Sequence, residues 1–339
     1  MPHWICSRPA ASLQLMIRVA AEHGVSESTC VAGCDLTEEQ LRDPAAEIAG
    51  VQELGALRNI LRALGSDVPF ALRAGLHYHT TTHGMWGFAI MSSATPRHAT
   101  DLSLRYSDLS YSFNRLDFKV VGGEGHYLYD DCDNPDDLKS ALVERDIGAL
   151  VTFGRDVFGY TVPVLSVQLR GPRPRYAAAF ETLFGLMPRF DAPCNCVAVD
   201  IALLDTPHPF GDAVGLRVCE EQCRTLLERR RLFSGIAGQV RTRMLRRPGD
   251  FPAMRTVAAE LGMSTRTLRN QLAREATSYR RLLEQTRELL AEELLSNARL
   301  GVDEIAARLG YHDTSSFVSA FKRWKGVPPR GYARQHFGS

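Results

Sequence analysis

The sequence predicts a mixed α+β N-terminal domain followed by an all-α C-terminal domain that contains two helix-turn-helix units joined by a long helix. Two observations predict the C-terminal part. The pattern Ala-Ala-x-Leu-Gly occurs at 258–262 and again at 306–310, and the segment 279–297 between the two copies has the apolar spacing of one amphipathic helix. A third observation predicts the N-terminal part, because short β-rich runs alternate with helical stretches in the first 204 residues.

The elements of the N-terminal part follow from hydrophobic periodicity and from turn residues. Two runs with alternating or β-branched character flank Gly122-Gly123-Glu124, which predicts a hairpin. The helices are expected at 45–64, with a break at Gly50, and at 135–150, 176–187 and 215–232; the strands are expected at 113–121, 125–130, 162–169 and 195–204. The sequence 234–247 is expected to form the first helix of the C-terminal part, ended by Pro248-Gly249-Asp250.

Each copy of the repeated pattern has the features of a helix-turn-helix. The glycine supplies the positive φ that a tight turn needs after the first helix. The two alanines are expected to let the second helix cross the first closely. In the second helices, Leu268 and Leu272 occupy the inner face of one copy, and Phe317 and Phe321 take the same places in the other.

The segment 279–297 is expected to be one continuous helix of about 28 Å at 1.5 Å per residue. Successive major grooves on one face of B-DNA repeat every ~34 Å. A rigid spacer of this length would therefore place the two second helices in adjacent grooves.

The charges divide between the two parts of the chain. Residues 229–339 hold 21 Lys and Arg against 10 Asp and Glu, whereas residues 1–228 hold 19 against 29. The net charge of +1 thus conceals a basic C-terminal part and an acidic N-terminal part. A basic part suits a phosphate backbone, so the C-terminal part is expected to provide the DNA contacts.

The sequence does not predict a targeting signal or a membrane segment. The apolar stretch 10–21 is interrupted by Arg18, and no run of 18 apolar residues is present. Eight cysteines without a secretory signal indicate a reducing compartment without disulfides. We expect a cytoplasmic protein that does not bind membranes.

The stretch from Phe251 to Arg334 resembles the DNA-binding domain of the AraC/XylS family of transcription regulators. The matching segments are VAAELGMSTRTLRNQL in the first unit and VDEIAARLGYHDTSSFVSAFKRWKGVPPRGYAR in the second. Upstream, His83-Gly84, Gly87 and the segment CEEQCRTLL resemble the subgroup whose N-terminal half is described as arabinose-binding-like. The chain departs from the subgroup at Ala276, where a glycine is usual, and at Asn270, where a second arginine is usual.

The resemblance implies three parts: an effector-binding and dimerisation domain at 1–228, a linker with the first helix of the DNA-binding unit at 229–250, and a double helix-turn-helix domain at 251–339. It also implies operator DNA, a small-molecule effector and RNA polymerase as partners, and activation of transcription. Effector binding is expected to change how the two DNA-binding domains of a homodimer are held.

The residues expected to contact DNA point away from the inner faces of the two second helices. Arg266, Arg269 and Asn270 would read base edges, because arginine pairs with guanine and asparagine with adenine through two hydrogen bonds. Hydroxyl groups of the second unit would read bases less decisively, and two basic residues would contact phosphates. The full set is Thr265, Arg266, Arg269, Asn270, Thr314, Ser315, Ser319, Lys322 and Arg323.

Other groups have a structural interpretation and a functional one. Several histidines and cysteines offer pairs of metal ligands, namely His77, His79 and His83 and the cysteine pairs 30/34, 194/196 and 219/223. A zinc site needs two such pairs to converge. Packing in the core is therefore the favoured interpretation. Two alternatives stay open: a thiol- or metal-responsive regulator, and a zinc-thiolate DNA-repair alkyltransferase that uses the same DNA-binding domain.

No catalytic motif, cofactor or metal site is expected, and the effector is not identified. The apolar helices permit a fatty-acid-like or an aromatic effector, and Arg73 or Arg97 would be placed to anchor a carboxylate.

Overall fold

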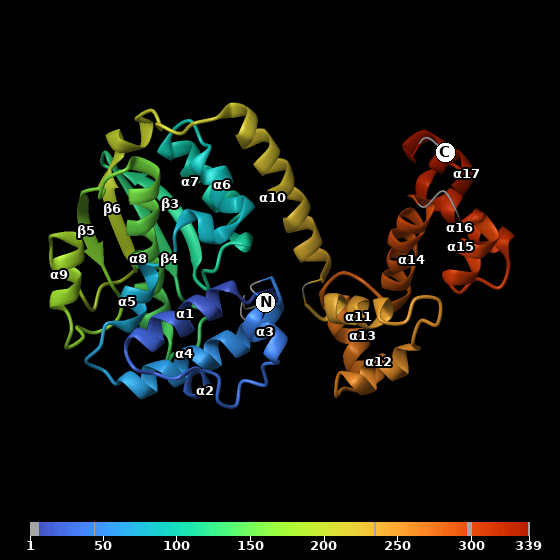
Figure 1. The fold of residues 1–339 in the computed structure, drawn as a ribbon, viewed down its shortest axis with the longest axis horizontal. Coiled ribbons are helices and arrows are strands. Elements are labelled where there is room, and N and C mark those ends of the chain that lie inside the picture. The colour runs from blue at the N-terminus through green and yellow to red at the C-terminus, as the bar shows by residue number, and fades with distance from the viewer. Residues whose placement is uncertain (1–6, 44, 234, 297–299, 338–339) are drawn as a thin grey trace. The chain divides into compact units, whose positions relative to one another are not determined.

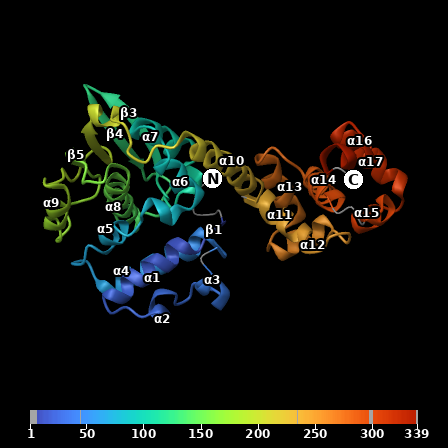
Figure 2. The same ribbon diagram turned by 45° about the horizontal axis from the view of Figure 1, so that its top comes forward.

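The computed structural model describes residues 7–43, 45–233, 235–296 and 300–337. The chain forms two compact units, Met1–Arg229 and Arg230–Ser339, and Figures 1 and 2 show the elements of each. The helix α10 (Ala213–Phe233) contains the residue at which the first unit ends.

The N-terminal unit begins with a helical layer and a small β-ribbon. Strands β1 (Ser7–Pro9) and β2 (Glu47–Ala49) pair antiparallel. The helices α1 (Ala11–Glu22) and α4 (Gly50–Leu64) are amphipathic, and their apolar faces share one core. The short helices of this region are α2 (Glu27–Cys30), α3 (Glu38–Arg42) and α5 (Phe70–Gly75).

A four-stranded antiparallel sheet follows, with the strand order β3-β4-β6-β5. Strands β3 and β4 form a hairpin, and Gly122 and Gly123 make its turn with φ values of 60° and 87°. The central strand β6 is buried at four of its five positions, as expected for a strand that is covered on both faces. The strands are β3 (Arg115–Val121), β4 (Glu124–Asp130), β5 (Val164–Gln168) and β6 (Cys196–Asp200).

The long helix α8 (Lys139–Phe158) packs between this sheet and α5. Glycines permit the close approach, because a Cβ at Gly75 would lie 2.2 Å from the carbonyl oxygen of Arg145, and one at Gly148 would lie 2.5 Å from that of Leu72. The remaining elements of this unit are η2 (Thr80–His83), α6 (Met85–Met91), α7 (Pro96–Arg105), η3 (Ser107–Leu109), α9 (Ala178–Phe184) and η4 (Ile201–Asp205).

In the described residues of the C-terminal unit, α-helices are the only regular secondary structure. Helix α14 separates two apolar cores, one around Leu268 and Leu272 and the other around Phe317 and Phe321. The helices are α11 (Gly235–Leu245), α12 (Met254–Glu260), α13 (Thr265–Arg274), α14 (Tyr279–Ser296), α15 (Val302–Arg308), α16 (Thr314–Lys325) and α17 (Pro329–Phe337). The expected fold class, an α+β domain followed by a double helix-turn-helix, is confirmed.

Several expected element boundaries are wrong. The segment 45–64 is expected to be helical on both sides of a break at Gly50, but the part before the break contains the strand β2. Ile48 is buried in the β-ribbon, and the helix starts at Gly50. The strand expected at 195–204 ends at Asp200, whose side chain caps the 3₁₀ helix η4. The helix expected at 135–150 starts later and runs eight residues further, to Phe158. The ends of the expected helices at Ser234 and Asn297 lie outside the described residues.

Candidate functional site

Both repeats of the C-terminal unit close their first helix in the same way. The amide of Met263 donates to the carbonyl of Ala258 at 3.0 Å, and the amide of Tyr311 donates to that of Ala306 at 3.0 Å. Gly262 has a φ of 67° and Gly310 a φ of 69°. These are the bonds of a glycine-terminated helix end, so the repeated sequence produces a repeated turn.

The alanine pairs are not used as expected. Ala258 and Ala306 are buried against the second helix of each unit, but Ala259 and Ala307 are exposed. The expectation that both alanines allow the crossing is therefore wrong for the second member of each pair. One small residue per copy suffices, because only one alanine in a row can face the crossing helix.

The second helix of the first helix-turn-helix, α13, presents a polar face. Ser264 caps it by accepting a hydrogen bond from the amide of Thr267 at 3.0 Å, while Leu268 and Leu272 are buried. At 100° per residue, Arg266 and Asn270 lie opposite this buried pair, and both are exposed. Arg269 and Thr265 are also exposed, nearer the flank of the helix.

The second helix of the other helix-turn-helix, α16, has the same arrangement with different side chains. Asp313 caps it, accepting from the amide of Ser316 at 2.7 Å, and these hydrogen bonds from Ser316 hold the pKa of the Asp313 carboxyl below its usual range. Ser315, Ser319 and Lys322 are exposed along one strip that is equivalent to Arg266, Asn270 and Ala273 of α13. Thr314 is half-buried.

Arg323, expected to contact phosphate, has an acidic neighbour. Its Nη2 lies 3.5 Å from Oε1 of Glu284 on α14, and the same carboxylate oxygen lies 3.6 Å from Nε of Arg280. Both arginine side chains are largely exposed, so these pairs are weak.

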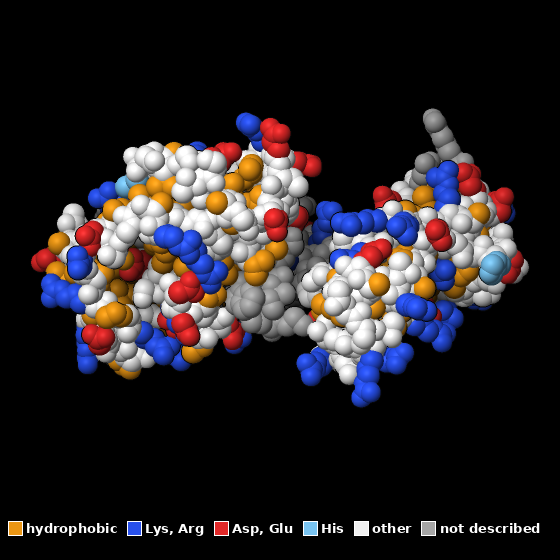
Figure 3. All heavy atoms as spheres, turned by 90° about the horizontal axis from the view of Figure 1, so that it is seen from below, with side chains coloured by type: hydrophobic (Ala, Val, Ile, Leu, Met, Phe, Trp, Pro, Cys, Tyr) orange, Lys and Arg blue, Asp and Glu red, His pale blue; other side chains and the backbone are white. Residues whose placement is uncertain are grey.

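Basic side chains gather on the C-terminal unit. Figure 3 shows several groups of Lys and Arg side chains standing out from this unit, at the right of the view. The excess of 21 basic over 10 acidic residues in 229–339 is therefore presented to solvent in part at these groups. Such a surface favours contact with a phosphate backbone.

The N-terminal unit contains a cavity of about 170 Å³ between the sheet and the helices α6, α7 and α8. The sheet contributes Tyr127, Tyr129 and Val197, whose side chains lie on one face. Helices contribute mainly apolar side chains, among them Trp86 and Phe153. A concave, apolar site with a few polar groups is the usual form of a small-molecule site.

The motif that begins at His83 builds one wall of this cavity. Gly84 has a φ of 58°, which starts α6 directly after the 3₁₀ helix. Gly87 lets α6 lie against that helix, because a Cβ there would be 1.6 Å from the carbonyl oxygen of Thr80. The rings of His83 and Trp86 then lie with centroids 4.9 Å apart, and both line the cavity.

A buried ionic network lies beside the cavity. Arg145 donates to Oε1 of Glu53 at 3.1 Å and to the carbonyl of Tyr111 at 2.6 Å, while Arg8 donates to Oε2 of Glu53 at 3.3 Å. Asp146, whose Oδ1 lies 3.5 Å from Nε of Arg145, accepts from Asn114 at 2.7 Å and from Ser112. Two positive and two negative charges thus balance within the network.

Neither expected carboxylate anchor lies at the cavity. Arg97 pairs with Asp205 through two hydrogen bonds of 2.7 Å at the surface, and Arg73 contacts the ring of His23 at 3.2 Å. Neither arginine lines the cavity. The arginine that does, Arg145, was not singled out from sequence, because its acidic partner Glu53 is 92 residues away.

The histidine and cysteine groups do not converge. His79 pairs with Asp156 at 3.0 Å, whereas His83 faces the cavity and His77 is exposed. Burial raises the pKa of the Cys196 and Cys223 thiols to about 11. A low pKa favours a reactive cysteine, so the raised pKa of these two thiols disfavours a redox role for them.

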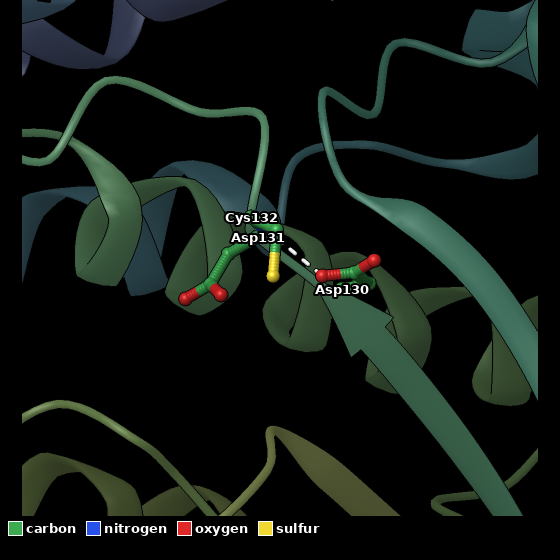
Figure 4. A group of neighbouring side chains, drawn as sticks. All are labelled: Asp130, Asp131 and Cys132. Carbon is green, nitrogen blue, oxygen red and sulfur yellow. Dashed lines mark hydrogen bonds between the residues drawn. The ribbon is translucent and has the colours of Figure 1, made fainter.

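Within the described part of the chain, the only cluster of three potential metal ligands is Asp130, Asp131 and Cys132, whose ligand atoms lie within 4.8 Å of one another (Figure 4). Asp131 is already held by Arg170 at 2.8 Å and by Asn195 at 3.1 Å. The Asp130 carboxylate accepts from the amide of Cys132 at 3.0 Å. These contacts account for the cluster as a strand-ending turn.

The arrangement defines a class of protein, namely a DNA-binding transcription regulator with two helix-turn-helix units and a separate N-terminal domain that contains a cavity. Residues 24–208 match the family described as the arabinose-binding domain of AraC transcription regulator, N-term, and residues 257–335 match a helix-turn-helix domain family. The chain belongs to the AraC family of transcription regulators.

Relatives match almost the whole chain. An uncharacterized HTH-type transcriptional regulator of Mycobacterium tuberculosis (strain H37Rv) is 32% identical over 340 residues, which cover 96% of each chain. The ornithine utilization regulator of Pseudomonas aeruginosa is 26% identical over 324 residues, which cover 96% of this chain and 95% of the other. The crystal structure of the transcriptional regulator CdpR from Pseudomonas aeruginosa aligns with a TM-score of 0.47 and 22% identity, over 96% of this chain and 98% of that chain.

Among the described residues, no helix combines the length and the apolar character that crossing a bilayer requires.

Proposed function

We propose that this AraC-family protein recognises its operator mainly through α13, and that α16 chiefly fixes the position of the protein on the DNA. The observation that carries the proposal is the difference between two equivalent exposed strips. On α13 the strip holds Arg266 and Asn270, which can each form two hydrogen bonds to one base. On α16 it holds Ser315, Ser319 and Lys322, which suit a hydroxyl contact and a phosphate.

The experiment maps the binding sites of the purified protein on fragmented host DNA and then measures affinity for one site. Arg266→Ala should cost about 1–3 kcal/mol of binding and relax the sequence preference at one base pair. Arg266→Lys keeps the charge but loses the two-bond contact, so it should also relax the preference. Discrete sites that are indifferent to both changes would refute the assignment of α13.

The contribution of α16 is tested by salt dependence. Lys322→Ala should weaken binding to all sequences alike and reduce the slope of log K against log salt by about 1. A sequence-dependent effect of Lys322→Ala would instead assign base reading to α16.

We further propose that a small molecule bound in the N-terminal cavity controls DNA binding and that the protein activates transcription through RNA polymerase, in the cytoplasm and without catalytic activity of its own. The cavity supports this proposal, because it is mainly apolar, lies between helices and the sheet, and belongs to the N-terminal unit. An effector would shift the arrangement of two DNA-binding domains only if it binds the two states with different affinity. A promoter fusion that host extracts or metabolites do not change would argue against effector control.

We propose that the active form is a homodimer and that α10 provides the contact. Three apolar side chains are exposed on one side of this helix, with Val214 63%, Val218 60% and Leu226 41% exposed. Along the adjoining flank the charges alternate in sign, at Arg217, Glu221, Arg224 and Glu228. When the α10 helices of two copies pair antiparallel, the charged flank of one helix faces the same flank of the other. Arg217 then opposes Glu228 of the second copy, and Glu221 opposes Arg224. Alternating signs make this pairing favourable for a second copy of the same chain.

Sedimentation equilibrium tests this contact. Arg217→Glu should shift the protein toward monomer, and the double variant Arg217→Glu, Glu228→Arg should restore the dimer, because every pair is again opposite in sign. Val218→Asp should give monomer by placing a charge in the apolar strip. A dimer unaffected by all three variants would place the contact elsewhere.

A further inference from the structure

Three polar atoms at the cavity have no hydrogen-bond partner among the described residues. They are Nδ1 and Nε2 of His83 and Nε1 of Trp86, and all three are buried. The Trp86 side chain is 3% exposed. Leaving buried donors and acceptors unpaired is unfavourable, and natural proteins rarely retain such groups without a use.

The charges around the cavity are already satisfied. Three charged residues line it. Arg145 is paired with Glu53 and a backbone carbonyl, Asp146 with Asn114 and Ser112, and Asp117 with Lys119 at 3.5 Å. Burial and the charge of Arg145 lower the pKa of His83 to about 3, so its ring is neutral at pH 7. A charged ligand would find no free counter-charge and would be desolvated at a large cost.

The size and the walls restrict the ligand further. An apolar cavity of about 150 Å³ holds one benzene molecule, and this cavity measures about 170 Å³. Aromatic side chains surround the two polar residues: the ring of His83 lies 4.6 Å from that of Tyr111 and 5.1 Å from that of Phe153, centroid to centroid. One ring with a short substituent fits these walls.

We propose that the cavity binds a neutral compound with a single ring and one hydroxyl oxygen, which accepts a hydrogen bond from Nε1 of Trp86 and donates one to a ring nitrogen of His83. The proposal rests on the assignment of the N-terminal unit as an effector domain and names the class of its ligand. The Trp86 indole can only donate, and a neutral histidine has one donor and one acceptor. A hydroxyl group therefore pairs Nε1 of Trp86 and one of the two ring nitrogens of His83, and the ring of the ligand fills the apolar remainder.

The test is calorimetric titration of the full-length protein with three matched probes: 4-methylphenol, toluene and 4-methylbenzoate. We expect 4-methylphenol to bind about 10-fold more tightly than toluene, because toluene leaves the polar pair unpaired, and 4-methylbenzoate to bind more weakly than both. Equal binding of the phenol and toluene would overturn the role of His83 and Trp86. Preferred binding of the benzoate would overturn the neutral ligand class, and binding of no probe would overturn the class altogether.

Variants separate recognition from stability. Trp86→Phe keeps an aromatic ring but removes the N–H, so the ratio of toluene to phenol dissociation constants should fall toward 1. His83→Gln keeps one donor and one acceptor and should retain part of the ratio, whereas His83→Leu should lose it. Tyr106→Phe is the control, because it also removes one polar hydrogen from an aromatic side chain, but Tyr106 does not line the cavity and its hydroxyl bonds Glu220 at 3.4 Å. It should leave the ratio unchanged. An unchanged ratio in Trp86→Phe and in His83→Leu, with both proteins folded by circular dichroism, would refute the proposal.

The outcome is distinguishable from a failure of effector control. The titration uses no DNA, so tight phenol binding without any change in operator affinity would leave the ligand class intact and reject effector control. Conversely, a host extract that changes operator affinity while no probe binds would retain effector control and reject the ligand class.

Discussion

Glu144 on α8 is expected to make the stability of the N-terminal unit fall as the pH rises. Its side chain is buried, and both of its carboxylate oxygens lie 3.0 Å from the hydroxyl of Tyr176. Burial raises the pKa of Glu144 from 4.5 to about 7, although the hydrogen bond from Tyr176 acts in the opposite direction. The folded protein therefore keeps a proton on Glu144 at pH values where the unfolded chain has lost it.

The sign and size follow from this difference in proton binding. The contribution of Glu144 is fully present below the unfolded pKa of 4.5 and is lost as the pH rises through the folded pKa of about 7. One pKa unit corresponds to 1.36 kcal/mol, so the total loss is about 3 kcal/mol, of which roughly 2.5 kcal/mol falls between pH 5 and pH 8. In Glu144→Gln the side chain does not titrate, and this part of the slope should disappear.

Urea unfolding at pH 5 and pH 8 measures the effect. The background Trp324→Phe removes the only tryptophan of the C-terminal part, so fluorescence then reports on Trp4 and Trp86. Burial lowers the pKa of His83 from 6.5 to about 3, so the stability that His83 contributes is lost as the pH falls below 6.5. This pH dependence has the opposite sign to that of Glu144. It is the same in the parent and in Glu144→Gln, so it cancels when the two are compared. The same pH dependence in Glu144→Gln and in the parent would refute the reasoning.

Three further predictions concern the backbone and a helix end. Ala276→Gly should stabilise the C-terminal unit by about 0.5–1 kcal/mol in urea unfolding, because Ala276 has a φ of 55°, a conformation that glycine adopts without strain; a loss of stability would contradict this. Glu275→Ala should lower the stability by about 1–2 kcal/mol in the same measurement. The reason is that the Glu275 carboxylate accepts hydrogen bonds from the amides of Ile236 and Ala237, at 2.9 and 2.8 Å, at the start of α11. Glu275→Gln keeps the acceptor and should cost less. Gly87→Ala should destabilise the N-terminal unit by about 3 kcal/mol or more, because its Cβ would be 1.6 Å from a carbonyl oxygen; a thermal midpoint equal to that of the parent would show that the helix can shift at little cost.

The C-terminal unit could be predicted from sequence because its determinants are local. The turn glycines Gly262 and Gly310 and the inner-face residues lie within one short segment of each unit, and the structure places them as their periodicity indicates. The usual glycine at position 276 in the subgroup also has a local cause, since the position requires a positive φ. Which exposed side chains touch DNA stays a prediction, because exposure is necessary for reading but does not demonstrate it.

The cavity could not be predicted, because its parts are brought together by tertiary contacts. Glu144, Arg145 and Asp146 form a charged run that periodicity places on a surface, yet all three are buried. Their partners Tyr176 and Glu53 lie 32 and 92 residues away in the sequence. Nothing local distinguishes such a run from a solvated helix face. The one available signal was the His83-Gly84 motif, which the resemblance marked without giving its role.

The contacts inside the C-terminal unit bear on how an effector would act. Arg287 on α14 lies over the ring of Phe251, at 5.3 Å, and over that of Tyr311, at 4.7 Å, so one side chain contacts segments of both helix-turn-helix units. The backbones of Gly249 and Gly310 also meet, because a Cβ on the second would lie 2.3 Å from the carbonyl oxygen of the first. These contacts oppose a change in the spacing of α13 and α16 within one chain. Control of DNA binding by a ligand is therefore better served by a change between the two chains of a dimer, which leaves each double helix-turn-helix intact.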